Sequence, residues 1–154
     1  MYDRQTEGQH PGRGHKVPRG EGEHLLFGGM EVLVRASAES TGGAFTVLEE
    51  INPIDVPLHV HRDRDELFFV LEGEHVFTVG DSEYEAAPGD LLFGPRGVPH
   101  AQRRVVPRVG RILTLFSPAG FEGFFRELAA ADARGEADGV FMGRLAARYS
   151  AEWR

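Results

Sequence analysis

The chain has 154 residues, a formal net charge of -7 and no cysteine. This length fits one domain with a sizeable core, and the missing cysteine excludes disulfides, thiolate metal ligands and a cysteine nucleophile. The negative charge argues against a nucleic-acid partner, which would need a basic surface. Because no apolar run is long enough to span a membrane and no signal peptide is recognisable, we expect a cytoplasmic protein without a membrane partner.

The first segment, residues 1–23, is rich in glycine, histidine, arginine and proline and has few apolar residues. Such a composition buries too little apolar surface to offset the entropy of the chain. We therefore expect a flexible N-terminal arm, in which His10 and His15 are solvated polar residues.

The second segment, residues 24–117, is rich in valine, leucine, phenylalanine and threonine, and turn residues interrupt it at short intervals. Many short strands with regular turns are typical of an all-β sandwich or barrel rather than of a parallel α/β sheet. The expected strands cover residues 25–35, 44–51, 66–71, 75–79, 83–86, 91–94, 100–104 and 110–116.

The third segment, residues 118–154, has helical periodicity. Apolar residues at spacings of three and four predict a first helix that ends at Gly135, and a second helix is expected over residues 140–149. These apolar stripes would pack against the barrel or against a second subunit, so we expect a homodimer. The residues that either form this contact or seal their own barrel are Phe121, Phe125, Phe141 and Leu145.

Four residues of the second segment predict a metal site. His59 and His61 are two apart, so on a strand they project from the same face. Glu66 follows a polar turn, and a carboxylate on a face otherwise lined by phenylalanine and valine is costly unless it is paired or bound to a cation. His100 arrives from a later strand after a turn that contains Gly97.

Neutral imidazoles and one carboxylate suit a divalent first-row metal ion, and this ligand set accepts iron, manganese, nickel, cobalt, copper or zinc. Four protein ligands on a metal that takes five or six leave an open position for water, substrate or dioxygen, which distinguishes a catalytic site from a structural one. His75 and His24 have no such partners and are expected to be structural.

These residues resemble the two motifs of the cupin superfamily. The first motif, HxHxxxxE with a glycine after six intervening residues, is matched by His59, His61, Glu66 and Gly73. The second motif, GxxxxxPxGxxHxxxN, is matched by Gly89, Pro95, Gly97 and His100. Two positions depart from the pattern, Arg104 where asparagine is usual and Pro53 where glycine usually opens the first motif, and neither is a ligand.

The resemblance implies a double-stranded β-helix, or jelly-roll barrel, over residues 24–117, with a C-terminal helical extension. Residues 117–128 further resemble the segment that follows the barrel in small bacterial single-domain cupins related to quercetin dioxygenase. We therefore expect an enzyme, a metal-dependent dioxygenase that acts on an aromatic, flavonol-like or other apolar small molecule. Two alternatives stay open, because this fold carries many chemistries: a redox-neutral polyketide cyclase or isomerase, and a non-catalytic metal- or ligand-binding protein.

In the dioxygenase, Glu66 would be both a ligand and the general base that takes a proton from the substrate hydroxyl. A sugar phosphate would instead need inward basic residues, and only Arg104 and Arg111 could supply them. Strand alternation places further residues towards the interior as a substrate pocket; these are Phe45, Val47, Phe68, Val70, Gln102 and Phe116.

Overall fold

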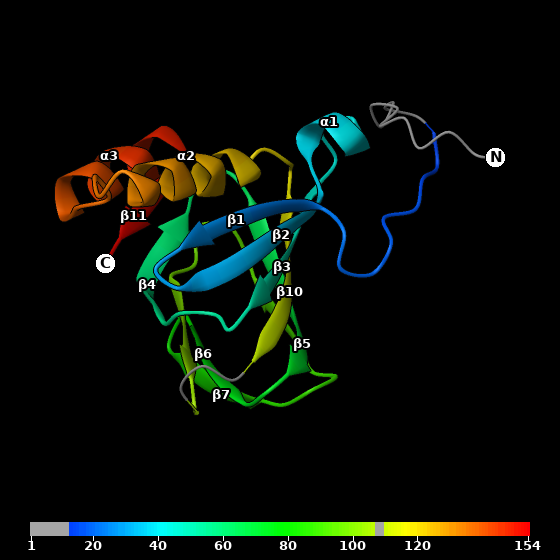
Figure 1. Cartoon of the computed structure of the whole chain (residues 1–154). Coiled ribbons are helices and arrows are strands. Elements are labelled where there is room, and N and C mark those ends of the chain that lie inside the picture. The colour runs from blue at the N-terminus through cyan, green and yellow to red at the C-terminus, as the bar shows by residue number, and fades with distance from the viewer. Residues whose placement is uncertain (1–12, 107–109) are drawn as a thin grey trace.

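The computed structural model describes residues 13–106 and 110–154, which form two antiparallel sheets with two helices at one end (Figure 1). The larger sheet has the order β1 (Glu23–Phe27), β2 (Met30–Ala36), β3 (Thr46–Ile51), β10 (Arg111–Ser117), β5 (Asp65–Glu72) and β8 (Leu91–Gly94). The smaller sheet has the order β11 (Ala151–Trp153), β4 (Val56–His61), β9 (His100–Arg104), β6 (His75–Val79) and β7 (Ser82–Ala86).

The inward faces of the two sheets form the core. Phe68, Val70 and Ile112 from the larger sheet pack against Phe77 and Ala86 from the smaller one. This arrangement confirms the predicted all-β fold of the double-stranded β-helix type with a helical C-terminal part. In the described residues the sheets face each other without closing into one continuous barrel.

The first strand departs from its prediction, because residues 25–35 form a hairpin instead of one strand. Gly28 and Gly29 have φ angles of 57° and 78° between β1 and β2. Positive φ at both central residues is the geometry of a two-residue hairpin turn, and two glycines adopt it without a steric penalty. The apolar run on both sides of the glycines concealed this turn.

A short helix, α1 (Ala38–Thr41), interrupts the segment in which only strands were expected. Ser37 and Ser40 form a reciprocal capping box, which satisfies backbone groups at the start of this single turn. The buried carboxylate of Glu122 accepts a hydrogen bond from the backbone N–H of Ala38 at 2.7 Å and from that of Gly120 at 2.9 Å. This side chain therefore ties α1 to the start of the C-terminal helices.

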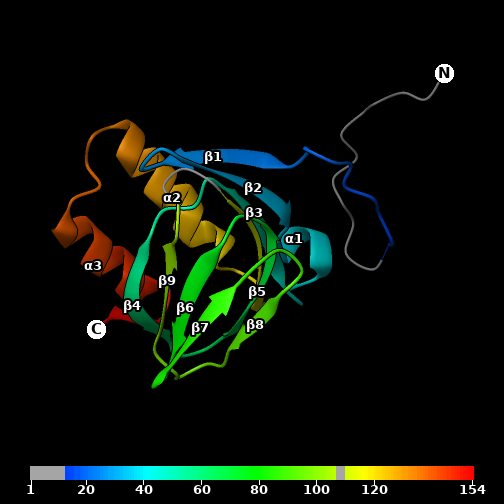
Figure 2. The same ribbon diagram turned by 90° about the horizontal axis from the view of Figure 1, so that it is seen from below.

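The two C-terminal helices are α2 (Glu122–Ala133) and α3 (Gly139–Arg148), and they lie across the end of the sandwich next to β1 and β4 (Figure 2). Gly135, with a φ of 69°, follows the end of α2 as expected, and Asp138 caps α3 through the Phe141 N–H at 2.8 Å. No helix in the described part of the chain is long and apolar enough to cross a membrane.

The apolar stripes of these helices pack within the same chain. Phe121, Phe125 and Leu145 are at most 9% exposed, and Phe141 packs against the same core. Of the two roles considered for these residues, the structure shows that they seal their own sandwich. Homodimer formation itself stays a prediction.

Strand β11 was not predicted. Its three residues add an edge to the smaller sheet by pairing with β4. The end of α2 is also tied to the first hairpin, since Asp132 accepts a hydrogen bond from the Gly28 N–H at 3.1 Å.

The division into an arm (1–23), a barrel (24–117) and C-terminal helices (118–154) stays a prediction, and residues 1–12, with His10, lie outside the described residues.

Candidate metal centre

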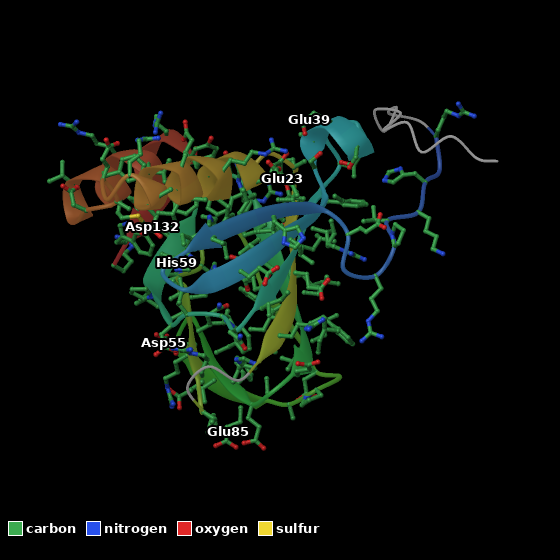
Figure 3. The ribbon with its side chains drawn as sticks, viewed as in Figure 1. Glu23, Glu39, Asp55, His59, Glu85 and Asp132 are labelled. Carbon is green, nitrogen blue, oxygen red and sulfur yellow. The ribbon has the colours of Figure 1, made fainter. Side chains whose placement is uncertain are left out.

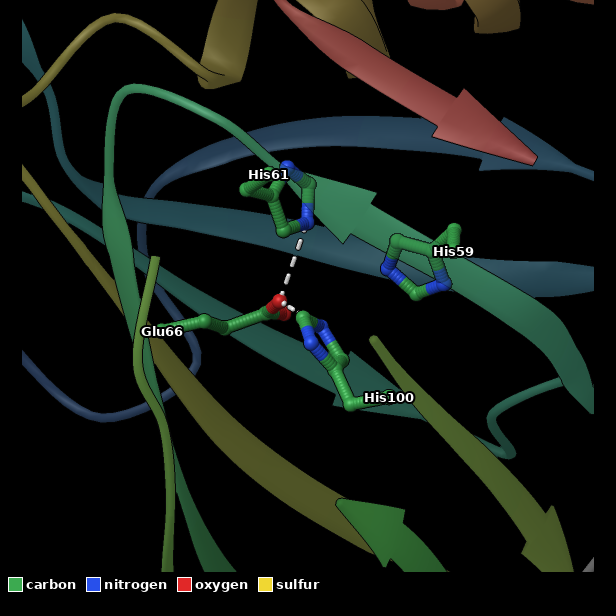
Figure 4. Close-up of side chains that lie close together, drawn as sticks. All are labelled: His59, His61, Glu66 and His100. Carbon is green, nitrogen blue, oxygen red and sulfur yellow. Dashed lines mark hydrogen bonds and ion pairs between the residues drawn. The ribbon is translucent and has the colours of Figure 1, made fainter. Parts of the chain in front are cut away.

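Three strands bring His59, His61, Glu66 and His100 to one point (Figure 4). His59 lies at the end of the sandwich near the helices (Figure 3). His59 and His61 project from the same face of β4, Glu66 lies on β5 in the opposite sheet, and His100 begins β9. His100 pairs directly with His59 across the two strands. The turn before β9 is held by the Gly97 N–H, which donates to the carbonyl of His61 at 2.7 Å.

The four side chains are close together and largely buried. Oε2 of Glu66 lies 2.7 Å from Nε2 of His100 and 3.1 Å from Nε2 of His61. The His59 and His100 rings are 4.4 Å apart between centroids. His61, Glu66 and His100 are at most 6% exposed, whereas His59 is only partly buried and lies on the cavity side.

Backbone carbonyls orient two of the imidazoles. Nδ1 of His59 lies 2.8 Å from the carbonyl of Pro57, and Nδ1 of His100 lies 3.2 Å from the carbonyl of Val98. A carbonyl only accepts, so each Nδ1 carries the proton and donates it. Nε2 of each ring is then the atom available to a metal, which is the usual arrangement of a metal-ligating histidine. In the structure, Nε2 of His100 donates to Oε2 of Glu66 instead.

The protonation of the group reflects burial and mutual charge. Burial lowers the pKa of His59 to about 4, so this imidazole is neutral near pH 7. Burial acts to raise the pKa of Glu66, but hydrogen bonds and charge from His100 and His61 outweigh it and lower the pKa to about 2. Burial likewise acts to lower the pKa of His100, and the bond to Glu66 outweighs it and raises this pKa.

This donor set fits a metal ion. One donor atom from each residue lies within 4.8 Å of all the others. First-row divalent ions bind imidazole nitrogen and carboxylate oxygen at about 2.0–2.2 Å, so donors at this mutual spacing are arranged for a shared ion. The four predicted ligands are therefore the four residues that the structure groups together, and their role as ligands is part of the proposal below.

A cavity of about 430 Å³ adjoins the four residues. This volume is in the range of small-molecule sites. Most of the residues that line the cavity are apolar. Many of these apolar residues are aromatic or belong to the C-terminal segment. The side chains that α2, α3 and β11 contribute include Phe121, Phe124, Phe125, Leu128, Met142 and Trp153.

The predicted pocket residues divide into two groups. Phe68, Gln102 and Phe116 line the cavity. Phe45 and Val47 do not line it. Leu48 and Glu50 occupy the inward face of β3, so Val47, next to Leu48, faces the other side, and Phe45 is exposed just before the strand. Val70 points inward but is fully buried in the core below the cavity.

Sequence reasoning missed Glu50 and the C-terminal wall. Glu50 is two residues after the apolar Leu48 and therefore shares its face of β3. The alternation argument that placed Glu66 inward would also have found Glu50 if the correct face of β3 had been assigned. The phenylalanines of α2 were identified as an apolar stripe, but nothing in their spacing indicates that a cavity lies beneath them. Trp153 ends a strand of only three residues, which is too short to show a sequence pattern.

The two facing antiparallel sheets and the buried group of three histidines and one glutamate define a β-sandwich protein with a candidate metal centre. A family model described as a cupin domain matches residues 47–116, which include all four residues of the group. This part of the sandwich is therefore similar to a cupin domain.

Individual relatives agree with this assignment. Over 86 residues the chain is 38% identical to a quercetin 2,3-dioxygenase of Bacillus subtilis (strain 168), which covers 54% of this chain. The chain spans only 26% of the length of that relative.

Solved structures share the fold. KdgF from a Halomonas species has a TM-score of 0.59 at 16% identity, with 70% of this chain and 97% of the other covered. An RmlC-like cupin from Shewanella frigidimarina NCIMB 400 has a TM-score of 0.59 at 21% identity, with 71% and 96% covered. At these identities the likeness concerns the fold alone.

Proposed function

We propose that this protein is a metal-dependent dioxygenase that acts on an aromatic, flavonol-like or other apolar small molecule. The observation that carries the proposal is the position of the histidine–glutamate group on the wall of a mainly apolar cavity that includes several aromatic rings. The similarity to a quercetin 2,3-dioxygenase supports the reaction class. That relative is much longer than this chain, so its activity comes to this chain only as part of the proposal.

The cavity wall also argues against a phosphorylated substrate. No arginine or lysine lines the cavity in the described part of the chain. The two basic residues considered for that role are engaged elsewhere: Arg104 with Asp55 at 3.5 Å, and Arg111 with Glu49 at 2.9 Å. An apolar cavity without a cation favours a substrate that is neutral or loses one proton at the metal end.

His59, His61, Glu66 and His100 would hold the ion. When bound, a divalent first-row ion supplies Lewis acidity and, for a redox-active metal, the electron transfer that dioxygenation requires. Glu66 balances the charge of the site and is the proposed acceptor of the substrate proton. The phenyl rings of α2 and β10 would orient a flat ligand and exclude water from the cavity.

The test combines metal analysis with substrate screening. Protein from its native host is analysed for bound metals, and oxygen consumption is then recorded with a panel of phenols that includes quercetin. Metal-dependent oxygen uptake with an aromatic compound supports the proposal. Turnover that proceeds without oxygen and with zinc would instead indicate a cyclase or isomerase. Tight ligand binding without any turnover would indicate a binding protein.

A homodimer in the cytoplasm is part of the same proposal. With Phe121 and Phe125 buried inside the chain, the exposed apolar residues on edge strand β8 are the better candidates for a contact, since Leu91 is 56% and Phe93 54% exposed. Light scattering at micromolar concentration distinguishes a dimer from a monomer of 17.0 kDa. A monomer at all concentrations would remove the dimer from the proposal.

A further inference from the structure

One buried carboxyl group on the cavity wall belongs to neither the metal group nor an ion pair. Glu50 lies on the inward face of β3, is 4% exposed and lines the cavity. Its neighbour Glu49 faces the other side of the strand, where Arg111 and Arg35 lie 2.9 and 3.7 Å away. No salt bridge to Glu50 occurs within residues 13–106 and 110–154. A buried acid without a cation is costly, so its retention needs a reason.

The surroundings of Glu50 are polar only where they touch its carboxyl group. The Thr114 hydroxyl, on neighbouring strand β10, donates to Oε2 at 3.1 Å. Gln102, on the facing sheet, also lines the cavity, and its side chain is near enough to Glu50 to act on the pKa of that carboxyl group. The residues paired with Glu50 across the larger sheet are the apolar Val32 and Ile112. The carboxyl and amide groups therefore form a small polar area in a wall that is otherwise apolar.

The protonation of Glu50 differs from that of Glu66. Burial, and then the charge of Glu66, raises the pKa of Glu50 to about 7, while hydrogen bonds from Thr114 and Gln102 act in the opposite direction. Glu50 therefore keeps a proton to higher pH than an ordinary glutamate does. A protonated carboxyl group both donates and accepts hydrogen bonds, as does a glutamine amide. Such a pair matches a hydroxyl or carbonyl group of a neutral ligand.

We propose that Glu50 and Gln102 form a second recognition point of the cavity, which binds a hydroxyl or carbonyl oxygen of the ligand away from its metal-binding end. This inference rests on the proposed function, because it takes the four-residue group as the site that holds the first end. It narrows the substrate class to flat, mainly apolar molecules with oxygen functions at two separate positions. Glu50 is then a specificity-determining residue.

The test measures binding instead of turnover, on zinc-loaded protein whose metal content has been verified. The parent probe is 3-hydroxyflavone, which has adjacent oxygens for a metal but no other hydroxyl group. The test probes are its derivatives with one added hydroxyl group, at each ring position in turn. We expect at least one derivative to bind the unaltered protein about 10-fold more tightly than the parent, as one buried hydrogen bond allows.

Substitutions then assign that preference to Glu50. Glu50→Leu keeps the bulk but removes the polar group, so the ratio of the affinities for the hydroxylated derivative and the parent compound should fall to about 1. Glu49→Gln is the matched control on the other face of the same strand and should keep the preference. If Glu50→Leu does not fold, Glu50→Gln should change the preference at least about 3-fold, whereas Glu49→Gln should not.

Each outcome is decisive. An unchanged preference in the Glu50 variants, no preference in the unaltered protein, or no binding of any probe overturns the inference. A Glu50-dependent preference in the zinc-loaded protein supports the inference; if the protein carrying its native metal then shows no oxygen uptake on the same compounds, the dioxygenase proposal is contradicted. Oxygen uptake together with a preference that is unchanged in the Glu50 variants supports the dioxygenase proposal and contradicts the inference.

Discussion

Trp153 lies directly opposite His59 across the pair of strands β11 and β4, and their ring centroids are 5.6 Å apart. The indole is 40% exposed and also lines the cavity. The last strand of the described chain therefore places an aromatic side chain between solvent and a candidate metal ligand.

Removal of this side chain should weaken ligand binding without loss of metal. In Trp153→Ala we expect the dissociation constant of 3-hydroxyflavone to rise about 10-fold, because one aromatic contact contributes roughly 0.5–1.5 kcal/mol beyond buried area. Trp153→Phe should retain most of the affinity. Calorimetric titration and metal analysis of both variants test this, and loss of metal from Trp153→Ala would contradict it.

Removal of a ligand should abolish metal binding. His59→Ala lacks one of the four donors, so bound metal and any activity should be lost together. His24→Ala is the control, because His24 is an exposed histidine whose Nδ1 contacts Glu31 at 2.8 Å, far from the cavity lining. Elemental analysis after dialysis should find about one ion per chain in the control. A fully metallated His59→Ala protein would be incompatible with the assigned ligand.

Glu66→Gln separates the two roles assigned to Glu66. The amide keeps an oxygen ligand of similar shape but removes the charge and the basic site. If Glu66 is the general base, activity at saturating metal should fall about 10²- to 10⁴-fold with metal still bound. The low pKa of about 2 makes Glu66 a weak base until a ligand changes its surroundings. Full activity of the metallated variant would leave Glu66 with the ligand role alone.

Glu50 should make stability depend on pH. Its pKa is 4.5 in an ordinary setting and about 7 in the fold. Below pH 4.5 Glu50 is protonated in both the folded and the unfolded protein. Between pH 4.5 and 7 Glu50 ionises in the unfolded chain but keeps its proton in the folded protein. Stability therefore falls as pH rises through this window, by up to about 3 kcal/mol.

The variant Glu50→Gln cannot ionise and serves as the reference for that effect. The difference in unfolding free energy between Glu50→Gln and the unaltered protein should grow in favour of the variant between pH 4.5 and 7, and then level off. Urea unfolding at matched metal content measures the difference. A difference that is the same at every pH would show that Glu50 is ionised in the fold.

Substitution by alanine should have different effects on stability at two glycines within helices. A Cβ on Gly143, within α3, meets nothing within 4 Å, so Gly143→Ala should stabilise the protein by about 0.5–1 kcal/mol through helix propensity. A Cβ on Gly123, in α2, would lie 3.0 Å from the ring of Tyr149. Thermal unfolding of Gly123→Ala should show no gain, and an equal gain in both variants would contradict the packing of α2 against Tyr149.

The metal group could be predicted because turns and the alternation of side chains along a strand determine where its residues lie. The two-residue spacing of His59 and His61 fixes their common face, and the motif around Gly97 fixes where His100 begins its strand. Each of these relationships is local in the sequence. The structure needs only to bring the two motifs together, which the fold does through the pairing of β4 and β9 within the smaller sheet.

The remaining part of the cavity was not predictable, because it depends on contacts between distant segments. The register of β3 decides whether Val47 or Glu50 faces inward, and that register is set by pairing with β2 and β10, not by the apolar pattern of β3 itself. The docking of α2 over the cavity likewise depends on Glu122 and on the β1–β2 turn.

The pairing of β11 with β4 also has a consequence for the order in which the molecule assembles. His59 leaves the ribosome about 90 residues before Trp153, its partner across the strands, and contacts between such distant residues form late. A nascent chain halted before residue 151 would hold all four candidate ligands without this edge of the smaller sheet. Metal capture can then precede completion of the cavity during synthesis, because the cavity wall is complete only after Trp153 has been added.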